Sequence, residues 1–242
     1  MEVNRVTPNF FVFFVLFVMR TMLDSTPRGN GVWDLPVRIF HWLLVLLVAS
    51  QIVTAFIGGN AMQLHALGGY AILTLILFRI LWGFFGGTHA RFVDFLHAPR
   101  TVIAYAKSLG GSIHATHRGH NPLGGWSVLA MLTSLLLQAS TGLFANDDVM
   151  LEGPLVKHVS GTVSSIATGI HEVNAFVLLS LVSIHIAAVL FYLFGKNENL
   201  IVPMITGRKP DSGVTPARYG SPWLAALLVG CCAAAVYFLI RI

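Results

Sequence analysis

Two histidines lie inside a long apolar stretch that runs from Gly169 to Gly195. The stretch is long enough to cross a bilayer, which takes about 20 helical residues. At about 100° and 1.5 Å per residue, His171 and His185 fall within about 40° of each other around the helix and about 21 Å apart along it. Ionisable residues are costly inside a spanning helix and usually face the interior of a bundle. The stretch therefore predicts a helical membrane bundle with histidine sites at two depths.

The composition predicts the same class. Hydrophobic residues make up 55% of the 242 residues and charged residues only 10%, whereas about a quarter of a soluble protein is charged. We expect an all-α integral membrane protein. The two cysteines, Cys231 and Cys232, are adjacent in an apolar run and are predicted to pack as small hydrophobic side chains. Because no Cys-x-x-Cys-His sequence occurs, covalent attachment of a c-type haem is excluded.

Five apolar segments are long enough to span a membrane. They cover approximately residues 36–56, 64–86, 126–145, 169–195 and 222–240. Asp34 is predicted to cap the first helix, whose first turn tolerates Pro36. An earlier apolar run, residues 9–19, has only about half the required length, and whether it spans, lies on the membrane or is removed stays open. The expected organisation is an N-terminal extension (1–30), a four-helix domain (31–210) and a C-terminal transmembrane helix (211–242).

The charges in the loops predict an orientation. Basic residues precede the first span and separate the second from the third and the fourth from the fifth: Arg20, Arg28, Arg38, Arg91, Arg100, Lys107, Arg118, Lys196, Arg208, Lys209 and Arg218. Lysine and arginine are enriched in cytoplasmic loops, so these segments are predicted to face the cytoplasm. They also account for the net charge of +5 without a nucleic-acid partner. The other two loops are uncharged (59–63) or mainly acidic (146–169), as expected outside.

This topology sorts four histidines by depth. His65 and His171 open the second and fourth helices at the outer side, whereas His41 opens the first helix at the inner side and His185 lies towards the inside. We therefore expect two pairs, His65 with His171 and His41 with His185. His185 lies farther than His41 from the nearest cytoplasmic charge. A tilted fourth helix, or one that extends into the cytoplasm, would bring the two histidines to the same depth in the membrane.

Paired imidazoles on facing helices can bind a metal ion or supply both axial ligands of a haem iron. No cysteine lies near these positions and carboxylates are scarce there, which disfavours a non-haem iron centre or a structural zinc site. We therefore expect non-covalent haem, although each histidine taken alone also fits an ordinary hydrogen-bonded core residue. The alternative function is a transporter or ion-conducting bundle that uses the buried histidines. It predicts inverted repeats or broken helices, which the sequence does not show.

Four motifs carry a resemblance to a known family: Trp33-Asp-x-Pro-x-Arg-x-x-His41-Trp42, Leu64-His65-x-x-x-Gly69, Arg79-x-x-Trp82-Gly83 and the spacing of His171 and His185. Over about residues 31–210 they resemble the bacterial cytochrome b561 and nickel–iron hydrogenase b-type cytochrome family. In that family, four helices hold two haem b groups with bis-histidine ligation. The resemblance implies that His41, His65, His171 and His185 are the axial ligands of the haem irons.

The resemblance also implies a function. The chain is expected to be a multi-pass protein of the bacterial inner membrane that transfers electrons between quinone in the lipid bilayer and a periplasmic redox protein, such as a hydrogenase or a c-type cytochrome. It would be an oxidoreductase component of a respiratory complex, with no catalytic side chain of its own. The sequence leaves the direction of electron flow and the oligomeric state, including a homo-oligomer, open.

Several polar residues outside the four ligands were also weighed. Arg79 is buried by its position in the sequence, and either extends to the inner interface or neutralises a haem propionate as a cofactor-binding residue. The spacing of His114, His117 and His120 would permit a metal, but a basic solvated loop is favoured. The remaining three, His89, His97 and His158, are predicted to be loop residues.

Overall fold

The computed structural model describes residues 31–109, 117–147, 151–209 and 218–242. Five of its helices are long and apolar enough to cross a membrane: α2 (Leu35–Ile57), α3 (Ala61–Phe85), α6 (Pro122–Gly142), α7 (Gly161–Gly195) and α9 (Pro222–Leu239). Within these ranges there is no strand, only two isolated β-bridges. The predicted all-α membrane fold with five spans is confirmed. The apolar run at residues 9–19 lies outside the described residues.

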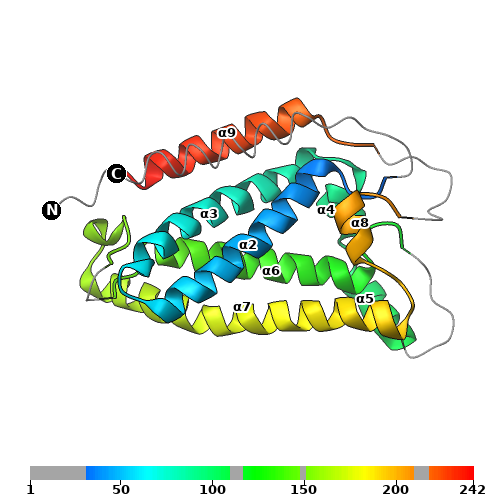
Figure 1. The fold of residues 1–242 in the computed structure, drawn as a ribbon, viewed down its shortest axis with the longest axis horizontal. Helices are drawn as coiled ribbons and strands as arrows, with labels where there is room; N and C mark the ends of the chain where they lie inside the picture. Colours follow the sequence, from blue (N-terminus) through cyan, green and yellow to red (C-terminus); the bar gives the residue numbers. More distant parts are fainter. Residues whose placement is uncertain (1–30, 110–116, 148–150, 210–217) are drawn as a thin grey trace.

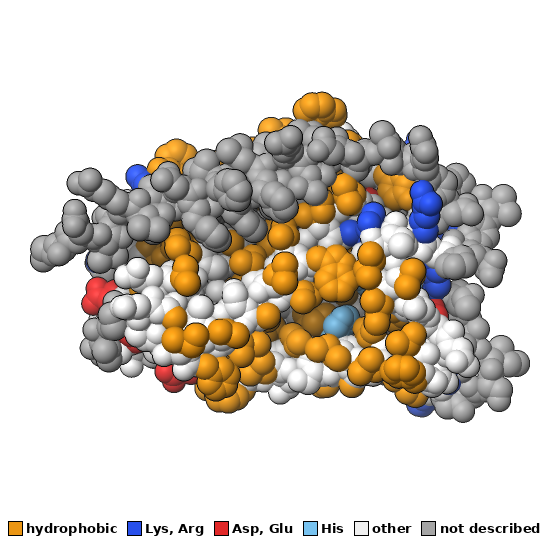
Figure 2. Space-filling view, in the orientation of Figure 1, with side chains coloured by type: hydrophobic (Ala, Val, Ile, Leu, Met, Phe, Trp, Pro, Cys, Tyr) orange, Lys and Arg blue, Asp and Glu red, His pale blue; other side chains and the backbone are white. Residues whose placement is uncertain are grey.

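Short elements join the spans. They are η1 (Thr88–Ala90), α4 (Phe92–Phe95), α5 (Pro99–Ser108), η2 (Val156–His158) and α8 (Ile201–Thr206). In Figure 1, α4, α5 and α8 gather at one end of the molecule, where α2 begins. On the face of the molecule that Figure 2 shows, most of the lysine and arginine side chains lie towards the same end. This distribution agrees with the predicted cytoplasmic side.

The four helices α2, α3, α6 and α7 form a bundle of two antiparallel hairpins, α2 with α3 and α6 with α7. The most buried helix is α3, which also contacts α6 and carries α9 on its other side (Figure 1). Its side chains Leu75, Ile76, Phe78 and Trp82 are completely buried. In contrast, α2 and α7 expose large apolar side chains such as Phe56 and Phe176. Such faces suit a lipid solvent.

The predicted cap at Asp34 is present. Its Oδ1 accepts a hydrogen bond from Val37 N at 3.1 Å, with Pro36 in the first turn of α2. The Oδ2 atom also accepts from Trp82 Nε1 at 3.1 Å and from Gly87 N at 3.3 Å. Burial raises the pKa of the Asp34 carboxyl, although these hydrogen bonds act in the opposite direction. Asp34 therefore both starts α2 and ties it to the end of α3.

Three spans begin earlier than predicted; for α3 the difference is small, because it begins at Ala61 instead of near residue 64. Helix α6 begins at Pro122 instead of near residue 126, because Asn121 Oδ1 accepts from Gly124 N at 2.7 Å and proline suits the first helical position. Helix α7 begins at Gly161, capped by Ser160, instead of at Gly169. Its 35 residues correspond to about 52 Å, against a hydrocarbon core of about 30 Å. The helix is therefore longer than the bilayer core is thick. Its additional residues lie at its start, on the predicted outer side, whereas its end at Gly195 is where the sequence predicts it.

Candidate functional site

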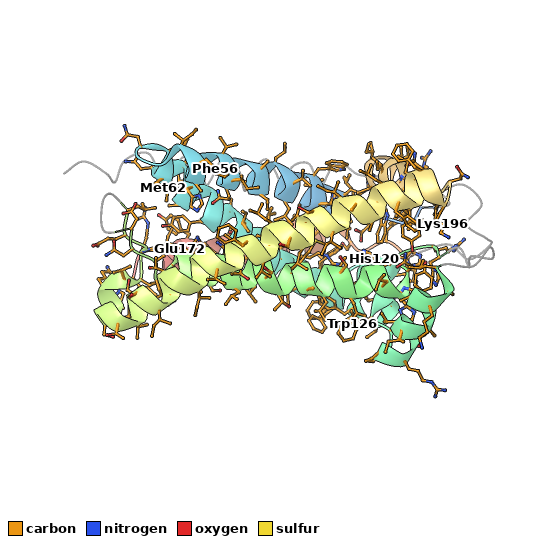
Figure 3. All side chains as sticks on the ribbon, turned by 90° about the horizontal axis from the view of Figure 1, so that it is seen from below. Phe56, Met62, His120, Trp126, Glu172 and Lys196 are labelled. Atoms are coloured by element: carbon orange, nitrogen blue, oxygen red, sulfur yellow. The ribbon has the colours of Figure 1, made fainter. Side chains whose placement is uncertain are left out.

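His65 and His171 face each other between the two hairpins. His65 lies near the start of α3 and His171 in the outer half of α7. Their ring centroids are 6.2 Å apart, with 73° between the ring planes. Figure 3 places Met62 of α3 and Glu172 of α7, which neighbour them in sequence, at the same end of the molecule. The structure thus brings together the outer pair that was predicted from helix depth.

The ring of His65 is held by helix α2. Its Nδ1 lies 3.2 Å from the carbonyl oxygen of Gln51 and 3.2 Å from Thr54 Oγ1. A carbonyl oxygen can only accept, so Nδ1 carries the proton and donates. The threonine hydroxyl donates to carbonyls of its own helix, to Ser50 O at 2.7 Å and Gln51 O at 3.1 Å. With Nδ1 protonated, Nε2 of the neutral ring keeps its lone pair for a metal.

The ring of His171 is held by helix α6 in the same way. Its Nδ1 lies 2.9 Å from the carbonyl oxygen of Gln138 and 3.3 Å from Thr141 Oγ1. The hydroxyl of Thr141 donates to Leu137 O at 2.8 Å and to Gln138 O at 3.1 Å. This ring therefore also presents a free Nε2.

The separation of the outer pair fits one metal ion bound by both rings. Metal–imidazole bonds are about 2 Å long, and each nitrogen lies about 1 Å from its ring centroid, so two ligands on opposite sides of an ion have centroids about 6 Å apart. The observed value is 6.2 Å. No group of three or more histidine, cysteine, aspartate or glutamate side chains is placed to hold a metal ion in the described ranges. Two imidazoles alone suit an iron whose other four ligands come from a haem macrocycle.

Small residues surround the outer pair. A Cβ atom at Gly69 would meet no atom within 4 Å, so the face of α3 beyond His65 is open there. Gly68 has a different role, because its missing side chain makes room for the Gln51 side chain, whose Nε2 would lie 2.1 Å from a Cβ. On the other hairpin, a Cβ at Gly142 would lie 3.1 Å from the His171 ring. Small residues therefore let the rings and α2 approach closely.

The inner pair, His41 of α2 and His185 of α7, is less tightly held. Both lie towards the inner end of the bundle, His41 in the second turn of α2 and His185 in the inner half of α7. The Nδ1 atom of His41 is buried and has no hydrogen-bond partner among the residues that the structure describes. An unpartnered buried polar atom is costly, and a ligand or an ordered water at this place would satisfy it.

Arg79 is buried, with only 2% of its surface exposed. Its Nη1 donates to Ala90 O at 3.1 Å, and its guanidinium lies 5.6 and 5.8 Å from the ring centroids of Phe92 and Phe95. Across the described ranges no carboxylate lies within ion-pair distance of it. Such burial does not fit the option that Arg79 extends to the aqueous interface. A buried cation of this kind suits an anionic group of a bound ligand.

His120 lies in the loop before α6, as predicted, but its ring is packed among aromatic side chains and is not solvated as expected. Its ring packs between Trp33 and Phe95, with centroid distances of 4.6 and 4.7 Å, and its Nδ1 is buried without a partner in the described part of the chain. Burial, assisted by the positive charge of Arg79, lowers the pKa of His120 to about 3, so the ring is neutral. In Figure 3 it lies at the end of the bundle where α6 begins.

The signal that was missed is the helix start at Asn121 and Pro122. It places His120 directly before the N-cap of α6, at the end of the bundle, and not within a free loop. The other loop histidines have simpler surroundings. The Nδ1 atom of His89 lies 2.8 Å from Asp94 Oδ2, and that of His97 lies 3.0 Å from Phe95 O. His114 lies outside the described residues.

A helical membrane bundle with two imidazoles held opposite each other between its helices has the architecture of a membrane cytochrome. The comparison with known families agrees with this class. The chain belongs to the prokaryotic cytochrome b561 family, whose sequence profile matches residues 32–207. It is therefore a multi-pass membrane cytochrome of the b type that functions in electron transfer.

A curated relative supports the same family. It is the probable Ni/Fe-hydrogenase B-type cytochrome subunit of Rhizobium leguminosarum bv. viciae, which is 22% identical over 209 residues. The aligned region covers 74% of this chain and 87% of the relative. No match is found among solved structures.

Proposed function

We propose that this protein transfers electrons across the bacterial inner membrane, between the quinone pool and a redox protein at the periplasmic face. Its family membership supports electron transfer through haem b. The name of the Rhizobium relative favours a hydrogenase as the partner, although a c-type cytochrome would suit the same role. Two histidine pairs at different depths supply the path, because one site near each surface shortens every electron transfer step.

The observation that carries the proposal is the arrangement of the outer pair. His65 and His171 each have Nδ1 hydrogen-bonded and Nε2 free, and their ring centroids are 6.2 Å apart, which fits one iron. We assign them as axial ligands of an outer haem, and His41 and His185 as those of an inner haem. A bound haem supplies a one-electron couple whose potential depends on its axial ligands and their surroundings. The bundle contributes the orientation of the imidazoles and a largely apolar enclosure.

Arg79 is the proposed partner of a propionate on the inner haem. The guanidinium is buried among aromatic rings and interacts electrostatically with the carboxylate of Asp34 and the ring of His120, both at the inner end. Charge-assisted hydrogen bonds to an anionic group would compensate for the burial of its charge. Asp34 lies too far away to form an ion pair and is occupied by the end of α3.

The direct test is the haem content of the purified protein. A pyridine haemochrome assay should give two haem b per chain, and a value of one or none would contradict the proposal. Substitution of His65 or His171 by alanine should remove the same spectral component in a redox titration, and substitution of His41 or His185 should remove the other one. A matched control is His158→Ala, because His158 is exposed in η2. This control should retain both components.

A further inference from the structure

The two hairpins of the bundle repeat the same features at constant distances in the sequence. Three residues of α2 or its N-cap have an identical or similar residue 87 positions later, in α6 or its N-cap. The pairs are Asp34 with Asn121, Gln51 with Gln138, and Thr54 with Thr141. Between α3 and α7 the distance is 106 positions, which relates His65 to His171 and Gly68 to Asn174. The first helices and the second helices of the hairpins therefore correspond residue by residue.

The contacts repeat as well as the residues. Each N-cap side chain binds the end of the second helix of its hairpin, Asp34 at Gly87 N and Asn121 at the hydroxyl of Tyr192, the latter at 2.9 Å. The Gln51 side chain lies against Gly68, and the Gln138 side chain accepts from Asn174 Nδ2 at 2.7 Å. The two hairpins therefore place corresponding side chains against corresponding parts of their second helices.

Corresponding residues also touch each other across the centre of the bundle. His65 contacts His171, and Trp33 contacts His120, which is its counterpart 87 positions later. Corresponding residues meet in this way only when they lie next to a two-fold axis that relates the two copies. Because both hairpins run in the same direction, this axis runs along the bundle.

The repeat is kept at the outer pair and lost at the inner pair. Arg79 occupies the position on α3 that corresponds to His185 on α7, and Val128 on α6 corresponds to His41 on α2. At the outer pair, in contrast, each hairpin supplies one histidine, one glutamine carbonyl and one threonine hydroxyl. The outer site is therefore built from two equal halves.

We propose that Thr54 and Thr141 are a matched pair of positioning residues for the outer site, a role that rests on the proposed function of His65 and His171 as iron ligands. The hydrogen of each hydroxyl is directed to a carbonyl of its own helix. Towards the imidazole each hydroxyl can therefore only accept. Together with the glutamine carbonyl it forms a two-acceptor cradle for Nδ1–H, which fixes the tautomer and the plane of the ring.

The cradle also affects the ligand strength of the ring. Acceptors at Nδ1–H make the imidazole more basic, and a more basic ligand favours the oxidised iron. Loss of one hydroxyl should therefore favour the reduced state of the outer component. Because the two halves are equivalent, Thr54→Val and Thr141→Val should have equal effects, and the double variant should show their sum.

The test uses the haem-loaded, full-length protein in detergent. At a fixed ambient potential, each valine variant should raise the ratio of reduced to oxidised outer component about threefold, as expected for loss of one weak hydrogen bond. The electron paramagnetic resonance signal of the oxidised outer component should shift too, because it reports the angle between the two ring planes. Thr54→Ser and Thr141→Ser retain the hydroxyl and should restore both properties.

Thr74→Val is the matched control. Thr74 is completely buried on α3 and bonds Tyr70 O of its own helix at 2.9 Å, and no imidazole contact is found for it within the described ranges. It should leave the ratio and the resonance signal unchanged. Loss of only the outer haem in the double valine variant, with recovery in the serine variants, would also support the proposal.

Three results would overturn it. These are an unchanged outer component in both valine variants, a change in only one of them, or a change that Thr74→Val reproduces. Each is observed with haem bound, so the proposed function would survive. A wild-type protein that binds no haem would instead overturn both the proposed function and the inference.

Discussion

Arg79 shows how one buried charge can influence the redox properties of the inner site. A guanidinium with 2% exposure keeps its charge in a region of low polarity, where charge interactions are screened far less than in water. A positive charge close to an iron site stabilises its reduced state relative to the oxidised state. The same residue that would neutralise a propionate would therefore also raise the reduction potential of the inner component.

Substitution of Arg79 by glutamine should lower the potential of the inner component by tens of millivolts, on the order of one charge interaction at an effective dielectric constant of about 20. Arg79→Lys should retain most of the wild-type value. Potentiometric titration followed by absorbance measures both components, and an unchanged outer component shows that the bundle is intact. Arg100→Gln removes an exposed charge and should change neither potential. An inner potential that does not respond to Arg79→Gln would contradict this role.

The sequence could predict the histidine positions because helical periodicity is local. The depth of His171 and His185 follows from their spacing alone, and the topology then suggests their partners. His120 could not be identified in this way, because its burial depends on Trp33 and Phe95, which are distant in the sequence. The cradles around the outer rings were missed for the same reason: each joins a histidine to a carbonyl of another helix.

At the level of the helices, the N-cap residues do more than start a turn. Asp34 and Asn121 each bind the end of the second helix in their hairpin, whereas Ser221 only caps α9, through Leu224 N. The sequence predicts the N-cap of α2 at Asp34, but it does not predict the N-cap of α6 at Asn121. Gly124 and Gly125 follow its cap, and glycine has a low helix propensity, so the apolar pattern alone indicates a later start.

Asp34→Ala should destabilise the protein more than Ser221→Ala does. Loss of a cap costs about 1 kcal/mol, and an unsatisfied buried donor such as Trp82 Nε1 costs about 1–3 kcal/mol more. Thermal unfolding of the haem-loaded protein in detergent compares the two midpoints. Ser221→Ala removes a cap without a second partner in the described structure, so it measures the cap alone. Equal midpoints for the two variants would show that the tie between α2 and α3 adds nothing.

At the scale of the whole molecule, the repeated hairpins and the charge distribution describe the same arrangement. Two hairpins that run in the same direction place both of their turns, between α2 and α3 and between α6 and α7, on one side. The outer pair therefore lies towards that side and the basic segments towards the other. The sequence shows no inverted repeat. The repeat about an axis along the membrane normal is not evident in the sequence, because few of the corresponding residues are identical.

Reporter fusions test this arrangement directly. A fusion after Lys107 in α5 should be fluorescent as a green fluorescent protein and inactive as alkaline phosphatase, since basic segments remain in the cytoplasm. A fusion after Lys157 in η2, or after Ile242 beyond α9, should give the opposite result, because Lys157 Nζ donates to Ile242 O at 2.9 Å and both therefore lie on one side. The reversed pattern would put the outer pair at the cytoplasmic surface. Electrons would then reach a periplasmic partner through the inner pair, and the proposed order of the two sites would be wrong.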